Sequence, residues 1–140
     1  ILAFNTHLDH MGREARSRGL RIICERLAEM RRRLSLPVIL TGDFNDEPDS
    51  EPLRVIGEFP LGAGAAAGER LVNAYDAVGL DAEQTGGTFH DFKGGEEGLP
   101  IDYIFVSPEI TVDELQVDRS QVDGGYPSDH YPVAATVRIG

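Results

Sequence analysis

The sequence predicts a single domain in which helices and strands pack together as a mixed α/β or α+β sandwich. The chain has 140 residues, which is the length of one ordinary domain. Apolar residues make up 41% of it, enough to build one core. Short β-prone apolar runs occur on both sides of a long amphipathic helix pattern, so both kinds of element belong to one fold.

The first expected elements are a strand and the longest helix. Residues 1–5 form a short apolar run that ends in polar residues, as a buried strand does at a sheet edge. Apolar residues then recur at steps of three and four, which places them on one stripe of a helix. The stripe consists of Leu20, Ile23, Leu27, Met30 and Leu34. Pro37 ends this helix, and Cys24 is expected to pack among its apolar residues.

Shorter elements follow in the middle of the chain. A strand is expected at residues 38–40, where three consecutive apolar side chains indicate burial on both faces. Residues 50–56 predict a short helix, because a serine that can cap it precedes an early proline. The small residues from Gly62 to Gly68 predict a loop, and residues 71–78 predict another short helix.

The last part of the chain predicts three further strands, at residues 88–92, 101–106 and 131–139. Residues 93–98 are rich in glycine and predict a loop. The strands are apolar enough to be buried on both faces, but the expected helices suffice for only one face. One face of the sheet therefore needs a further cover.

Charge and cysteine content narrow the function classes. The 24 acidic and 13 basic residues give a net charge of -11, which opposes strong sequence-independent binding to duplex DNA. A lone cysteine excludes an internal disulfide and a thiolate metal cage. No apolar stretch approaches the ~20 residues of a transmembrane helix, so we expect a soluble protein whose compartment the sequence leaves open.

Eight of the basic residues lie between Arg13 and Arg33, on the expected long helix. We interpret them as a solvated helix face in preference to a nucleic-acid patch, because the rest of the chain is strongly acidic. Arg13 and Arg16 are the arginines expected to come nearest to a bound phosphate.

Polar residues gather in four short clusters at or near the ends of expected strands. The clusters are Asn5-Thr6-His7, Gly42-Asp43-Phe44-Asn45, Ile101-Asp102-Tyr103 and Ser128-Asp129-His130. Each alone is more often a turn or a cap than a site. Together they would supply a general base, an orienting carboxylate, oxygen ligands for a hard cation and donors to phosphate. This inventory is typical of phosphoryl transfer.

Two other metal-binding motifs match the sequence in part. Residues 7–10 resemble the His-x-Asp-His part of binuclear zinc hydrolases, but Asn5 stands where the preceding histidine is required. This is a minor alternative. Residues 43–49 resemble the start of an EF-hand loop, but Pro48 replaces the required glycine, so that interpretation fails.

The four clusters, in this order, resemble those of the endonuclease/exonuclease/phosphatase superfamily, whose members share a metal-dependent attack of water on phosphorus. The resemblance covers nearly the whole chain and corresponds to the C-terminal half of the family domain. It implies that residues 1–140 form a single domain equivalent to that half. The implied fold is α+β: a mostly antiparallel sheet with helices on one face, half of a four-layer α/β/β/α sandwich.

The resemblance also implies roles for individual residues. His130 is expected to activate water, and Asp102 to orient its imidazole. Asp43 and Asn45 are expected to position the nucleophile and to handle the leaving oxygen or the metal. His7 is expected to donate to the scissile phosphate.

The metal implied by the resemblance is Mg²⁺ or Mn²⁺, with Asp129, Asp43 and Asn45 as ligands. The expected substrate is a phosphate ester from nucleic acid, a phospholipid head group, an inositol phosphate or a nucleotide. The family's metal-binding glutamate lies in an N-terminal half that would precede residue 1 and would cover the open sheet face. Two further hypotheses follow: the chain forms a homodimer through that face, or it is a non-catalytic half-domain that needs a partner.

Overall fold

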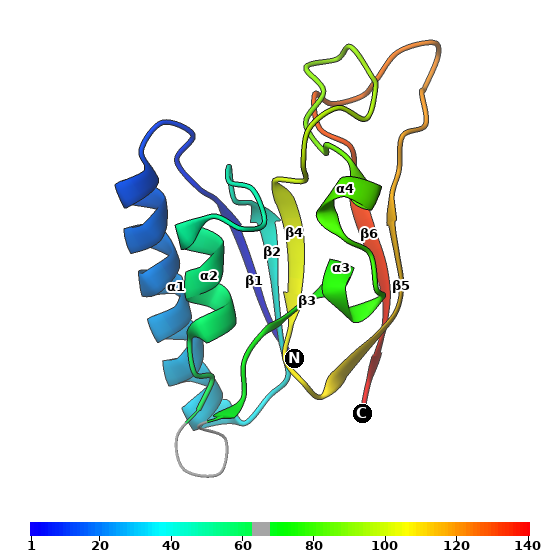
Figure 1. Cartoon of the computed structure of the whole chain (residues 1–140). Helices are drawn as coiled ribbons and strands as arrows, with labels where there is room; N and C mark the ends of the chain where they lie inside the picture. Colours follow the sequence, from blue (N-terminus) through cyan, green and yellow to red (C-terminus); the bar gives the residue numbers. More distant parts are fainter. Residues whose placement is uncertain (63–67) are drawn as a thin grey trace.

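The computed structural model describes residues 1–62 and 68–140, and it has the predicted α+β architecture (Figure 1). The strands are β1 (Leu2–His7), β2 (Val38–Asp43), β3 (Val72–Asn73), β4 (Asp102–Val106), β5 (Ile110–Val117) and β6 (Val133–Ile139). The helices are α1 (Arg13–Leu34), α2 (Glu51–Glu58), α3 (Ala74–Ala77) and α4 (Ala82–Thr85). The loop predicted at residues 62–68 lies largely outside the described residues. No helix within the described ranges is both long and apolar enough to cross a bilayer.

The strands form two ladders instead of one continuous sheet. A four-stranded sheet has the order β1-β2-β4-β3, and β5 pairs with β6 in a second ladder. β1 and β2 are parallel, while β2-β4, β3-β4 and β5-β6 are antiparallel, so most pairs have the predicted direction. The parallel pair exists because α1 carries the chain back to the starting edge of the sheet, as a βαβ crossover must.

Helix α1 confirms the predicted apolar stripe for most of its length. Leu20 and Leu27 are fully buried, which stabilises the fold by about 1.5–3 kcal/mol for each side chain. Cys24 lies beside them in the core, and burial raises the pKa of its thiol to about 11. Leu34 is half exposed because the helix ends at this point: Ser35 adopts a left-handed conformation (φ 49°) and its N–H donates to the carbonyl of Arg31 at 2.8 Å.

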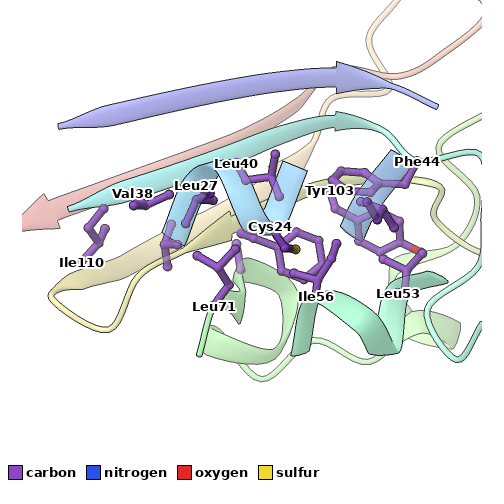
Figure 2. Packing of buried hydrophobic residues seen from close by; sticks show 14 of the residues in the cluster. Cys24, Leu27, Val38, Leu40, Phe44, Leu53, Ile56, Leu71, Tyr103 and Ile110 are labelled. Atoms are coloured by element: carbon purple, nitrogen blue, oxygen red, sulfur yellow. The ribbon is translucent and has the colours of Figure 1, made fainter. Parts of the chain in front are cut away.

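One face of the sheet is covered by helices and forms the core (Figure 2). Leu40 of β2 points into this face, toward Leu27 of α1 and Ile56 of α2 (Figure 2). Phe105, which pairs with Leu40 on β4, belongs to the same core cluster. Phe44 packs edge-on against Tyr103 and extends the core toward the start of β4, with ring centroids 5.5 Å apart. The helices thus lie on one side of the sheet, as predicted.

The opposite face carries the alternate residues of the same strands. Asn5, Thr41 and Ile104 lie next to one another in the β1-β2-β4 register, and each is exposed or half-exposed. With Val133 near the start of β6, they line an open hollow in the surface. Within the described part of the chain, no helix packs over this face (Figure 1).

Three local predictions differ from the structure. The helix predicted at residues 71–78 begins with strand β3 and is helical only in α3. The strand predicted at residues 88–92 makes a single bridge, between Phe89 and His130, and otherwise turns. Strand β5 was not predicted, because a β-bulge between Val112 and Glu114 breaks the alternation of its apolar residues.

Candidate active site

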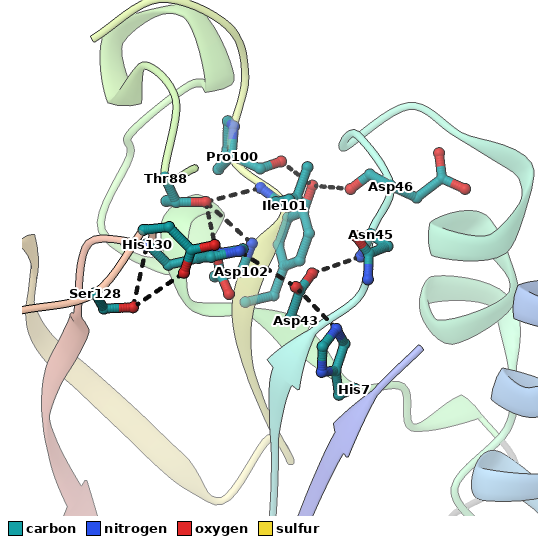
Figure 3. A network of polar contacts seen from close by, with 12 residues as sticks. His7, Asp43, Asn45, Asp46, Thr88, Pro100, Ile101, Asp102, Ser128 and His130 are labelled. Atoms are coloured by element: carbon teal, nitrogen blue, oxygen red, sulfur yellow. Dashed lines mark hydrogen bonds and ion pairs between the residues drawn. The ribbon is translucent and has the colours of Figure 1, made fainter. Parts of the chain in front are cut away.

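Three of the predicted site residues lie in one row across the end of the sheet (Figure 3). His7 of β1 pairs with Asp43 of β2, and Asp43 pairs with Asp102 of β4. Residues that pair directly on neighbouring strands point to the same face and lie within side-chain contact distance. Strand register therefore joins three clusters that are far apart in the sequence, and it places them on the open face.

His130 completes the row from the segment that precedes β6. Its Nδ1 lies 2.7 Å from Oδ2 of Asp102. Burial lowers the pKa of His130, but the hydrogen bond to Asp102 and the charges of Asp43 and Asp129 outweigh burial, and the net effect raises that pKa. An imidazole with a raised pKa and a fixed carboxylate partner can take up a proton and hold it, as a general base requires.

Asp43 lies between two imidazoles. Its Oδ2 is 3.6 Å from Nε2 of His130 and 3.4 Å from Nε2 of His7. Burial raises the pKa of Asp43 and the charge of Asp102 adds to this increase, while the amide of Asn45 and the two histidines oppose it; the net shift is upward. Keeping Asp43 ionised beside Asp102 therefore costs free energy in the folded protein. A bound cation would offset this cost, because it stabilises the charged carboxylate.

Asn45 is fixed by the loop that follows β2. It has a left-handed backbone (φ 50°), and its N–H donates to Oδ1 of Asp43 at 2.8 Å. Its Nδ2 donates to the carbonyl of Leu8 at 2.8 Å, so this side chain ties the loop after β2 to the loop after β1. A metal ligand from Asn45 would therefore be its Oδ1.

The carboxylates of the site suit a hard divalent cation. Among the described residues, one group of histidine and carboxylate ligand atoms is close enough to share an ion, within 4.8 Å of one another: Asp43, Asp102 and His130. Asp129 is not in that group. Asp129 is half-exposed, and its Oδ1 lies 3.4 Å from the Ser128 hydroxyl, although its charge acts on His130. A metal role for Asp129 stays a prediction.

A model of the endonuclease/exonuclease/phosphatase family matches residues 2–130. The chain belongs to this family. Its members hydrolyse phosphate esters and include nucleases and phosphatases. The family match covers the row of site residues from His7 to His130.

Solved structures of the family agree with this assignment. The chain is 28% identical to Bacteroides thetaiotaomicron mannosyl-6-phosphatase (TM-score 0.78), covering 98% of this chain and 51% of the phosphatase. A functionally unknown Enterococcus faecalis protein is 26% identical (TM-score 0.76; 99% of this chain and 50% of that one). The human Nocturnin catalytic domain with bound sulfate shares the fold at 24% identity (TM-score 0.62; 97% and 46%). The chain thus spans about half the length of these structures. No curated protein sequence matches it.

One arginine near the site differs from its predicted position. Arg16 does not face a phosphate site: it is buried, and its Nε donates to Oδ2 of Asp46 at 2.7 Å. It also donates to the carbonyl of Asp9 at 3.1 Å, and so holds together the two loops beside the row.

The zinc-hydrolase alternative depends on Asp9 and His10. Asp9 accepts a hydrogen bond from the amide of Met11 at 3.1 Å, and neither Asp9 nor His10 belongs to the ligand group found among the described residues. The zinc-hydrolase alternative therefore lacks a cluster in this part of the chain.

Sequence reasoning missed the residue beneath the His130-Asp102 pair. Thr88 is fully buried, and its hydroxyl donates to Oδ2 of Asp102 at 2.7 Å (Figure 3). The sequence carries no strong signal for this contact, because threonine is common in strands and Thr88 is separated from Asp102 by a glycine-rich loop. The bridge between Phe89 and His130 places Thr88 beside the segment that carries His130.

Proposed function

We propose that this chain carries the catalytic half of a divalent-metal-dependent phosphoesterase in which His130 activates the attacking water. The 2.7 Å contact between His130 Nδ1 and Asp102 Oδ2 carries this proposal. Nε2 of His130 takes the proton from water, and Asp102 stabilises the imidazolium that results. His7 donates to the scissile phosphate from the neighbouring strand.

Mg²⁺ or Mn²⁺, held by Asp43, Asn45 and Asp129, would neutralise charge on the phosphate when bound. The donor set supports a hard ion because all three residues offer oxygen. Carboxylates cannot bind a phosphate ester directly without repulsion, so an acidic site of this kind needs a cation to accept an anionic substrate.

The substrate is a phosphate monoester or diester. The chain is 28% identical to a mannosyl-6-phosphatase, and this similarity supports a small-molecule phosphomonoester as the substrate of this chain. The net charge of -11 supports the same preference, because it weakens binding to nucleic acid.

We infer that a further segment, bearing the family's metal-binding glutamate, covers the open sheet face in the active enzyme. The face has no helix over it among the described residues, and the matched structures are about twice as long as this chain.

When the chain is expressed alone, we expect two copies to form a homodimer through this open face. Light scattering would show a mass near twice 15.3 kDa, and Ile104→Arg on the open face would reduce it to one chain. A monomeric wild-type chain would contradict self-association.

Hydrolysis of bis-p-nitrophenyl phosphate and p-nitrophenyl phosphate tests the proposed activity. The assay compares Mg²⁺, Mn²⁺ and EDTA for the wild type, His130→Ala and His10→Ala, which removes an exposed histidine outside the site. We expect turnover that requires the metal, disappears in His130→Ala and persists in His10→Ala, and we expect the monoester to be preferred. Turnover in EDTA, or in His130→Ala, would overturn the mechanism.

An inactive chain calls for the same assay on a longer protein that includes the covering segment. Turnover there would assign an indispensable ligand to that segment. A longer protein that is also inactive would support the second hypothesis, a non-catalytic half-domain.

A further inference from the structure

We propose that Thr88 is a positioning residue: its hydroxyl holds the carboxylate of Asp102 in the orientation in which Asp102 pairs with His130. The roles of Asp102 and His130 rest on the proposed function, but the positioning contact can be measured without any turnover.

Two hydrogen bonds converge on one oxygen atom. Oγ1 of Thr88 donates to Oδ2 of Asp102 at 2.7 Å, and Nδ1 of His130 lies 2.7 Å from the same Oδ2 (Figure 3). The three side chains form a continuous chain from threonine to carboxylate to imidazole. Any rotation of the carboxylate that weakens one contact also weakens the other.

The direction of the threonine hydrogen bond is fixed by its surroundings. Oγ1 of Thr88 accepts the N–H of Ile101 at 3.0 Å and the N–H of Asp102 at 3.3 Å. A hydroxyl has one proton and two acceptor lone pairs, so two amide donors leave the proton for Asp102. Thr88 is fully buried, so bulk water does not compete for that proton.

The backbone around Thr88 is attached to the segment that carries His130. The carbonyl of Thr88 accepts the N–H of Tyr131 at 2.8 Å, and the N–H of His90 donates to the carbonyl of Asp129 at 2.9 Å. The Phe89 ring packs edge-on against the His130 ring, with centroids 5.2 Å apart. Thr88 therefore holds Asp102 from the same framework that holds His130.

The second hydrogen bond restricts the rotation of the Asp102 carboxylate in the Asp102-His130 pair. The terminal torsion of an aspartate has a broad energy minimum, so one hydrogen bond leaves the carboxylate free to turn. Asp43 lies on the other side of His130 and competes for its imidazole, with Oδ2 3.6 Å from Nε2. A second donor on Oδ2 of Asp102 keeps that carboxylate facing Nδ1, which leaves Nε2 as the nitrogen that takes the proton from water.

The test compares Thr88→Val, which removes the donor at nearly constant volume, with Thr88→Ser, which keeps it. The matched control is Thr85→Val: Thr85 is also buried, but its hydroxyl donates to the carbonyl of Asp81 at 2.8 Å, away from Asp102. In the hydrolysis assay, Thr88→Val should lower kcat by about 10- to 100-fold with KM nearly unchanged, as outer hydrogen-bond partners of active sites do. Thr88→Ser should restore most of kcat, and Thr85→Val should leave it unchanged.

The second readout needs no substrate. In metal-free, ¹⁵N-labelled protein, NMR detects the proton that His130 Nδ1 shares with Asp102. We expect this resonance in the wild type, Thr88→Ser and Thr85→Val, and we expect it to shift or broaden in Thr88→Val. If the valine variant fails to fold, Thr88→Cys replaces it, and its weak thiol donor should change the resonance in the same direction.

The outcomes separate the two proposals. An unchanged resonance in Thr88→Val, an equal kcat loss in Thr88→Ser, or an equal loss in Thr85→Val would overturn the role of Thr88 even if the enzyme is active. A resonance that depends on the hydroxyl, in a protein that hydrolyses no phosphate ester, would support the positioning role and count against the proposed function.

Discussion

The two faces of the four-stranded sheet are built from the same strands but serve different purposes. On β2, Leu40 points into the core and is fully buried, while its neighbour Thr41 lies on the open face and is half-exposed. On β4, Tyr103 packs in the core, while Asp102 points to the open face and meets His130. Because side chains alternate along a strand, one short segment supplies both stability and chemistry.

The comparison teaches where substitutions should act. A side chain on the covered face is surrounded by apolar atoms, so its removal leaves a cavity and lowers the free energy of unfolding. A carboxylate on the open face is held beside other charges at a cost, so its removal changes activity more than stability. Four predictions test this separation, from the largest expected effect to the smallest.

The largest effect is expected at the open face. Asp102→Asn keeps the shape of the side chain but removes the charge that stabilises the imidazolium of His130, so kcat should fall by about 10²- to 10⁴-fold. Steady-state hydrolysis of p-nitrophenyl phosphate measures the loss, and a thermal melt should show little change. A variant that is active but strongly destabilised would break the proposed separation of the two faces.

On the covered face, Leu27→Ala should lower the free energy of unfolding by about 2–5 kcal/mol, because Leu27 is fully buried against the sheet. Urea denaturation measures this loss. The control is Ile22→Ala on the same helix, where the side chain is 65% exposed and the change should be small. The kcat of Leu27→Ala should stay near the wild-type value at temperatures where the variant is folded; a loss similar to that of Asp102→Asn would contradict the comparison.

The negative charges around His130 should raise the pKa that is measured for its imidazole. In EDTA, NMR should place the pKa of His130 above the ordinary histidine value of about 6.5, because Asp102, Asp43 and Asp129 outweigh the effect of burial. A raised histidine pKa stabilises the fold at low pH, and this contribution is lost as the pH rises through the raised value. Asp102→Asn should lower the pKa of His130, and added Mg²⁺ should lower it as well. A wild-type value at or below 6.5 would show that burial dominates.

The smallest change in stability is expected at Asp43. Its raised pKa means that the folded protein favours the protonated carboxyl, so the ionised form is a cost at neutral pH. Asp43→Asn removes the charge and still accepts a hydrogen bond from the amide of Asn45. It should raise the free energy of unfolding in EDTA by about 0.5–1 kcal/mol while abolishing hydrolysis. Denaturation at pH 7 and at pH 4 measures the gain, which should shrink at the lower pH; a loss of stability would show that Asp43 is held favourably.

Local patterns in the sequence determined the elements that depend on local physics. The stripe of apolar residues and the proline at position 37 locate α1, because helix periodicity and the missing proline amide act within a few residues. The apolar runs locate β2 and β4 for the same reason. The four clusters predict the family because each is short and contiguous, and a model of that family matches residues 2–130.

Tertiary structure decided the rest. Register alone joins His7, Asp43 and Asp102 in a row, because a shift by one residue would point each of them to the other face. The burial of Arg16 against Asp46, the bulge in β5 and the hydrogen bond from Thr88 to Asp102 all depend on partners far along the chain. Such contacts form only when the chain has folded. Residue type and spacing therefore predict the chemistry of this site, while long-range packing determines its geometry.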